Sequence, residues 1–215
     1  LGMAYGSLIG AGTSAAIYST NVLLTGQKWN WNSFGMSLAC GAIGGALSGG
    51  FGALGGQLGT FGQSLSYNLL SNITSNSATT FAFGSDVSTG DFIGMIAGGF
   101  IGNKIGNFNG VKGGVLKNIG AEFAFNMSKG TITGGIGGAI GAIIDGDDIG
   151  DSFIQGAKFG AIGGATMAGL NIAIMGASYI PDNVYENFEN DQPVYRRGTF
   201  LTKTIGGEGS GLTIG

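Results

Sequence analysis

The chain of 215 residues contains no histidine, one cysteine and two prolines. Without histidine it has no Ser-His-Asp or Cys-His catalytic unit, no zinc site built on imidazole and no default general base near neutral pH. The lone Cys40 excludes an intrachain disulfide, and its apolar neighbours predict a small buried side chain rather than a nucleophile. Collagen is excluded because proline is so rare and glycine does not recur at every third residue.

Charge is also scarce. Charged residues make up 10% of the chain, against about 25% in soluble domains. The nine Lys and Arg residues are scattered and the isoelectric point is near 4.7, which excludes nucleic acid as a partner. A hydrophobic content of 43% with positive mean hydropathy is not the composition of a disordered chain.

Long stretches of the chain carry almost no charged residue. Residues 1–85 carry a single charge, Lys28, and residues 159–181 carry none. The best candidate for a membrane span, residues 159–180, is long enough, but Asn171 and five glycines make it only marginally apolar. Two interpretations stay open at this point: permanent membrane insertion, and a water-soluble form that inserts on demand.

What is abundant is glycine, with 47 residues, and it is placed in an internal repeat. Segments 33–46 and 152–165 are identical at eight of fourteen positions, and segment 91–102 is a third, partial copy. The shared pattern is Ser/Asp-Phe-x6-Gly-x-Ile-Gly at a period near 60 residues. It divides a glycine-rich helical region, 1–178, into units of about 1–60, 61–118 and 119–178, which are followed by a polar connector, 179–215.

Each unit is predicted to be a helical hairpin, so the expected fold is all-α, with a short irregular or β tail. Three turn pairs are expected: Thr25-Gly26, Thr89-Gly90 and Asp145-Gly146. The predicted N-caps of the second helices are Ser33, Asp91 and either Asp151 or Ser152. In the tail, Val194-Tyr195 and Thr199-Phe200-Leu201 suggest short strands.

A glycine inside a helix costs about 1 kcal/mol relative to alanine, so something must offset so many of them. Spacing at i, i+3 and i+4 gives a helix a flat strip on which another backbone can approach closely, as in a glycine zipper. The alternative of flexible Gly/Ser linkers does not explain the interleaved Ile, Leu and Phe. The predicted helix-packing residues are Gly41, Gly44, Gly45, Gly99, Gly102, Gly160, Gly163 and Gly164.

Other motifs give no clear site. The acidic run 145–151 departs from the EF-hand pattern and is interpreted as a turn that caps the next helix. The candidates for an enzyme that works through carboxylates alone are Glu186, Glu189 and Asp191, which lie in what looks like an exposed acidic loop; Glu186 or Glu189 would have to be buried and paired. Trp29 and Trp31 either anchor a hairpin turn on the core or lie at a membrane interface.

Several segments together resemble the region that follows the core of bacterial RHS/YD-repeat proteins, ahead of their variable C-terminal toxin. They are residues 25–31 (Thr-Gly-Gln-Lys-Trp-Asn-Trp), the glycine-rich helical units, and residues 195–200 (Tyr-Arg-Arg-Gly-Thr-Phe) leading to 209–211 (Gly-Ser-Gly). The resemblance implies a polymorphic toxin, delivered by a secretion system against neighbouring cells, with its C-terminal part enclosed in a β-cocoon. It carries no catalytic residue over to this chain.

We therefore expect a noncatalytic, glycine-zipper helical segment of a secreted bacterial toxin. It would help a C-terminal effector reach or cross a membrane, with any catalytic domain after Gly215 and no catalytic, cofactor or metal site in these residues. The alternative is a structural spacer or plug, packed in the parent toxin shell or in an oligomer, with no membrane activity. The expected partners are accordingly a membrane, the parent shell or further copies of the chain.

Overall fold

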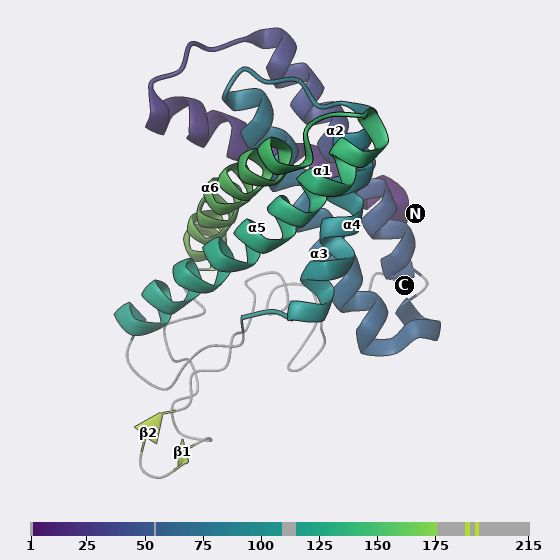
Figure 1. The fold of residues 1–215 in the computed structure, drawn as a ribbon. Coiled ribbons are helices and arrows are strands. Elements are labelled where there is room, and N and C mark those ends of the chain that lie inside the picture. Colours follow the sequence, from purple (N-terminus) through teal and green to yellow (C-terminus); the bar gives the residue numbers. More distant parts are fainter. Residues whose placement is uncertain (1, 54, 109–114, 176–187, 190–191, 194–215) are drawn as a thin grey trace.

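The computed structural model describes residues 2–53, 55–108, 115–175, 188–189 and 192–193. Six helices follow one another along the chain (Figure 1): α1 (Gly2–Thr25), α2 (Trp31–Ala53), α3 (Gly55–Ala82), α4 (Thr89–Ile105), α5 (Val115–Asp145) and α6 (Ile149–Met175). Two short strands, β1 (Phe188–Glu189) and β2 (Gln192–Pro193), form an antiparallel pair. The predicted all-α fold is confirmed, while the tail strands expected at 194–195 and 199–201 lie outside the described residues.

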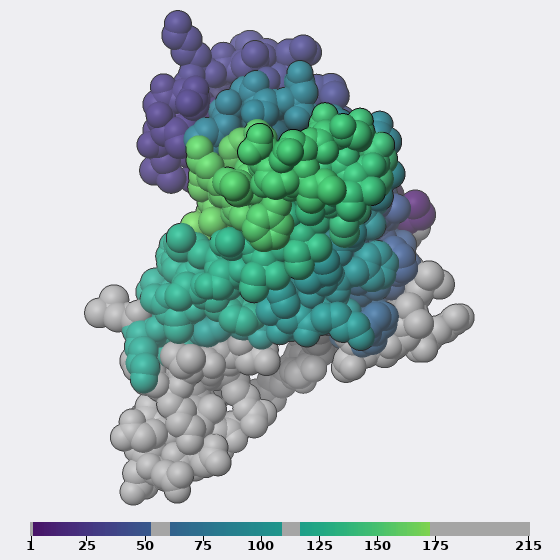
Figure 2. Space-filling model, viewed as in Figure 1, coloured from purple at the N-terminus to yellow at the C-terminus, as the bar shows by residue number. Residues whose placement is uncertain are grey.

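Every helix packs against the next one along the chain, so the fold is a series of helical hairpins. The α1–α2, α3–α4 and α5–α6 turns lie at the same end of the bundle. Ser88 Oγ donates to Asp145 across two of these turns, and Val87 beside the second turn and Phe34 beside the first pack against the same buried cluster. In Figure 2 the α5–α6 hairpin covers much of the visible face.

Helix α3 is the central element, because it contacts each of the other five helices. Its residues 72–82 are buried without interruption, although most of them are Asn, Ser or Thr. Residues 72–82 have no apolar stripe, so helical periodicity alone does not predict their core position. Its burial results from the hairpins packed around it.

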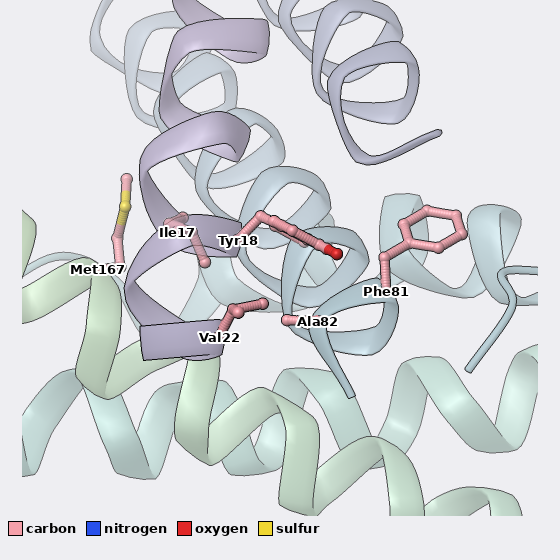
Figure 3. Packing of buried hydrophobic residues seen from close by; sticks show 7 residues of the cluster. Ile17, Tyr18, Val22, Phe81, Ala82 and Met167 are labelled. Atoms are coloured by element: carbon pink, nitrogen blue, oxygen red, sulfur yellow. The ribbon is translucent and has the colours of Figure 1, made fainter. Parts of the chain in front are cut away.

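An apolar cluster joins α3 to α1 and α6 near the hairpin turns (Figure 3). Ile17, Tyr18 and Val22 of α1 pack against Phe81 and other residues of α3, with Met167 of α6 closing one side. Ile17 and Tyr18 have almost no exposed surface. Burying each such side chain stabilises the fold by about 2 kcal/mol, so this cluster fixes how the first hairpin sits on the centre of the molecule.

The three predicted N-caps are wrong by about one helical turn. Ser88 caps α4, accepting from the Asp91 backbone N–H, while the Asp91 carboxylate accepts from Ser88 N–H in a capping box. Asn30 Oδ1 accepts from the second and third residues of α2, and Asp148 Oδ1 from Asp151 N–H at the start of α6. Each helix begins earlier because another Asn, Ser or Asp precedes the predicted cap and reaches the free N–H groups first.

One predicted turn is also wrong. Gly26 and Gly146 adopt positive φ angles of 68° and 80° in their turns, as their positions suggested. Thr89 and Gly90, by contrast, begin α4, and the turn before that helix is built on Gly84, with φ of 78°. Gly90 is buried because its backbone lies against α5 at Gly141.

Candidate functional site

Glycine seams hold the hairpins together. On α1 and α2, Gly6 lies against Gly45 and Gly10 against Gly41, each pair in reciprocal contact. A Cβ added to any of the four would overlap the carbonyl oxygen of its partner, so the glycine's own α-hydrogen points at that oxygen. Such Cα–H···O contacts and the accompanying dispersion help to offset the intrinsic penalty of a helical glycine.

The last hairpin repeats this arrangement. Gly130 of α5 pairs with Gly160 of α6, and Gly134 with Gly156, again with backbone against backbone. The middle hairpin does not. In α4, Gly99 packs on the Leu69 side chain of α3, and the backbone seam of α4 is formed with α5, through Gly94 and Gly137.

All eight glycines predicted to pack helices lie against another helix in the structure. In both copies of the Gly-Ala-Ile-Gly-Gly-Ala motif, residues 41–46 and 160–165, the three glycines contact corresponding helices. The first and third glycines, Gly41 with Gly45 and Gly160 with Gly164, face the hairpin partner. The middle ones face α3, where Gly44 meets Ile73 and Gly163 meets Ser75, while Gly102 of the third copy meets Asn68 and Lys129.

Polar hydrogen bonds join α3 to its neighbours. Asn21 of α1 donates to Thr79 Oγ1 at 3.0 Å and accepts from Thr166 Oγ1 of α6 at 2.9 Å, so one buried side chain connects three helices. Ser48 of α2 and Ser66 of α3 each donate to the other's carbonyl oxygen, at 2.8 and 2.7 Å. These bonds satisfy polar groups that would otherwise be stranded in the interior.

Lys129 of α5 closes the other end of the α3–α4 hairpin. Its Nζ donates to Asn68 Oδ1, to the Gly106 carbonyl oxygen at 2.6 Å and to Asn107 Oδ1 at 3.2 Å. It also lies 5.8 Å from the centre of the Phe125 ring. Burial lowers the pKa of Lys129 to about 8, because the ammonium has lost much of its water.

Many large apolar side chains lie on the outer surface, although the interior holds both apolar and polar side chains. Of the exposed large hydrophobic side chains, Leu8, Leu23 and Leu24 of α1 are each more than 70% exposed. The others are spread over the outward faces of the remaining helices and include Met36, Ile43, Phe61, Ile93, Phe100, Ile132, Ile143, Ile144, Phe153 and Ile154. Where such side chains form a contiguous patch, that patch commonly meets a partner or a membrane.

One stretch of the described residues, Trp31–Gly52 in α2, is long and apolar enough to cross a membrane by length and composition, and a third of its best window is buried. The α1–α2 turn beside it is held by aromatic rings. Trp29 packs on Tyr18 and Phe34, with ring centroids 5.2 and 4.9 Å apart, and Tyr18 Oη donates to the Asn30 carbonyl oxygen. Trp31 also touches Trp29 and Phe34 but remains 74% exposed.

The acidic run 145–151 has a structural role in the turn. Asp145 accepts from Ser88 Oγ at 2.5 Å and from Gly90 N–H at 3.2 Å, and Asp148 caps α6, as the turn interpretation required. Within the described part of the chain, no three Asp, Glu or Cys side chains are grouped so that they could hold a metal ion. Of the acidic residues considered for hydrolysis, Glu189 lies in β1, and Glu186 and Asp191 lie outside the described residues.

Comparison with known protein families, curated proteins and solved structures finds no match to this chain. The structure itself therefore defines the class: over the residues that it describes, an all-α arrangement of six helices in sequential hairpins, with glycine seams, a partly polar core and many exposed apolar side chains. The polar centre was not predicted. Its signal was present in the sequence, because a helix made of uncharged Asn, Ser and Thr, with no Lys, Asp or Glu to face water, indicates burial.

Proposed function

We propose that the chain is a noncatalytic helical module that associates with a lipid membrane through its apolar outer face and assists delivery or membrane passage of a C-terminal effector. The observation that carries this proposal is the set of large apolar side chains on the outside of a bundle whose core is partly polar. Buried Asn, Ser and Thr side chains bond between helices, while Leu23, Leu24, Trp31 and other large apolar side chains are exposed. Small residues at helix contacts and polar bonds between helices are the features that hold helices together in lipid.

The scarcity of charge supports the same proposal. A charged side chain resists transfer into an apolar medium, and the α1–α2 hairpin carries only Lys28, in its turn. Trp29 and Trp31 lie beside that lysine, in positions where tryptophan commonly meets a membrane interface. The bacterial polymorphic-toxin setting remains a proposal based on the resemblance at 25–31 and in the tail, and the parent reading frame tests it: YD repeats upstream support it, and their absence removes it.

Liposome flotation of the full 215-residue chain, at neutral and acidic pH, tests the membrane proposal. We expect the chain to float with the vesicles and its tryptophan fluorescence, from Trp29 and Trp31 together, to shift to the blue. In Leu23→Gln/Leu24→Gln, binding should weaken by about fivefold for each leucine, because about 1 kcal/mol of burial in the interface is lost per side chain. The matched control, Thr131→Gln, adds the same amide group at an exposed polar position and should bind like the unchanged chain. No association at any pH would exclude the proposal.

The alternative is a spacer or plug that packs in a toxin shell or with further copies of itself. It is favoured by the finding that only α2, among the described helices, contains a stretch apolar enough to span a bilayer. This alternative predicts that the chain binds no lipid and resists protease only when the parent shell is present.

A further inference from the structure

Of the three described hairpins, α1–α2 is the one that a bilayer interior resists least. Its two helices contain no charged residue, and its turn contains one, Lys28. Helix α3 is also uncharged, but its buried half consists largely of Asn, Ser and Thr, and α4, α5 and α6 each contain acidic and basic residues. Moving one charged side chain to the centre of a bilayer costs about 3 kcal/mol or more, so the other two hairpins are disfavoured there.

The dimensions of this hairpin also fit a bilayer. Its helices have 24 and 23 residues and are therefore each about 35 Å long, against about 30 Å for the hydrocarbon layer. The stretch Trp31–Gly52 of α2 is apolar enough to span, and only a third of its best window is buried. An apolar helix in the core of a water-soluble protein is buried over most of its surface.

The contact between α1 and α2 is of a kind that persists in lipid. Gly6 and Gly10 are four residues apart on α1, and they lie against Gly45 and Gly41, which are four apart on α2. Glycine pairs with this spacing join helices in membranes, where dispersion and close backbone approach replace the hydrophobic effect. The hairpin can therefore leave the bundle without separating its own two helices.

The hydrogen bonds from this hairpin to the rest of the bundle come from near the ends of its helices. Asn21 bonds to Thr79 and Thr166, and Ser48 bonds to Ser66. Asn21 is four residues before the end of α1 and Ser48 five before the end of α2, which places both within about 8 Å of a helix end. In a spanning hairpin they would lie near the headgroups, where water and lipid can replace the lost partners.

We propose that the α1–α2 hairpin separates from α3 and spans the bilayer as one unit, with Lys28, Trp29 and Trp31 of its turn region in the opposite headgroup layer. This rests on the membrane association proposed above, and it names the segment that enters the hydrocarbon and the contact that opens. Lysine and tryptophan are residues that commonly stop at such an interface. A covalent link between α2 and α3 should therefore block insertion while leaving surface binding intact.

A depth-sensitive label on α2 tests the insertion. In the full chain with Cys40→Ala, Ile43→Cys places a thiol at a 52% exposed position near the middle of the apolar stretch. This thiol is labelled with bimane and mixed with vesicles of phosphatidylcholine and phosphatidylglycerol that carry a nitroxide at mid-chain or at the headgroup. We expect the mid-chain nitroxide to quench more strongly. The matched reference, Thr131→Cys on exposed α5, should lose no more emission to the mid-chain nitroxide than to the headgroup one.

A disulfide between α2 and α3 tests the release. The Ser48 and Ser66 hydroxyl oxygens are 2.9 Å apart, so Ser48→Cys and Ser66→Cys bring two sulfurs close enough to bond. Position 43 is labelled while this disulfide is closed. We expect the oxidised chain to float with the vesicles but to lose the mid-chain quenching, and reduction of the same sample, which is its own control, to restore it.

The outcomes separate this proposal from the more general one. A chain that does not float with vesicles would exclude membrane association and insertion together. A chain that floats while position 43 is quenched no more deeply than position 131 would overturn insertion alone. Equal mid-chain quenching of the oxidised and reduced forms would overturn the release from α3. If the disulfide variant does not fold, the unlinked labels at 43 and 131 still decide whether the hairpin inserts.

Discussion

At the scale of single residues, the contact that a glycine makes decides its role, and the composition does not. Gly10 and Gly12 lie two positions apart on α1. Gly10 is buried against the α2 backbone at Gly41, whereas Gly12 faces open space. At Gly12 only the intrinsic cost of a helical glycine counts, whereas at Gly10 the benefit of a close backbone approach is added to it.

Alanine substitutions at these two positions should have opposite effects. In Gly10→Ala the new methyl group overlaps the Gly41 carbonyl oxygen, so we expect the free energy of unfolding to fall by about 3 kcal/mol. Gly12→Ala meets no atom and should raise it by about 0.5–1 kcal/mol. Urea unfolding followed by circular dichroism measures both. Equal effects at the two positions would contradict the glycine-seam interpretation.

Lys129 gives the molecule a pH dependence with a defined sign. Its pKa is about 8 in the folded chain, against 10.5 ordinarily. Between these values the unfolded chain holds a proton that the folded chain has released, so this group adds stability as pH rises from about 8 to 10.5. At pH 7 both states are protonated, and burial of the ammonium lowers stability.

The comparison with Lys129→Met isolates this effect, because the other titrating groups are shared. We expect the unfolding free energy of the unchanged chain, relative to that of the variant, to increase between pH 7 and pH 10. Urea titrations of both proteins at the two pH values give this difference. A constant difference, or one that moves in the opposite direction, would show that burial does not govern the Lys129 pKa.

At the scale of helices, the structure shows which sequence patterns predicted the fold. The repeat around Phe34, Phe92 and Phe153 correctly located the second helix of every hairpin. The pattern extends over about ten residues in each copy, so a mismatch at one position does not hide it. The N-caps were misplaced because several Asn, Ser and Asp residues precede each helix, and only geometry decides which one is close enough to the free N–H groups.

Two features of the elements could not be read from the sequence. Alpha-helical periodicity places the glycines of α4 on a face, but it does not say whether that face meets α3 or α5. In the structure the backbone seam is with α5, through Gly94 and Gly137. Contacts between the α3–α4 and α5–α6 hairpins are likewise invisible in the sequence: the hydrogen bonds of Asn76 run through Asn72 to the Met95 carbonyl oxygen of α4.

The Asp148 cap provides a test at the start of α6. Its Oδ1 accepts from Asp151 N–H at 2.8 Å, and removing such a cap lowers stability by about 1 kcal/mol. Asp148→Ala should therefore lower the midpoint of thermal unfolding. Asp147→Ala, which removes the neighbouring carboxylate without removing a cap, should change it little, and an equal loss in both would indicate a general charge effect.

At the scale of the whole molecule, α3 should be the last element to open. It is covered by all five other helices, and its residues 72–82 are fully buried. Native-state hydrogen exchange followed by mass spectrometry should therefore show the slowest exchange in 72–82 and faster exchange in α1 and α6. Slower exchange in α1 than in α3 would contradict a central position for α3 in solution.

The sequential packing of the hairpins has a mechanical consequence. Each helix packs against the one before it in the chain, and α6 packs mainly on α5. A pull on the C-terminal side would therefore detach α6 first and the α4–α5 seam next. The force needed should come in a few separate steps of about one helix each, rather than in one cooperative break.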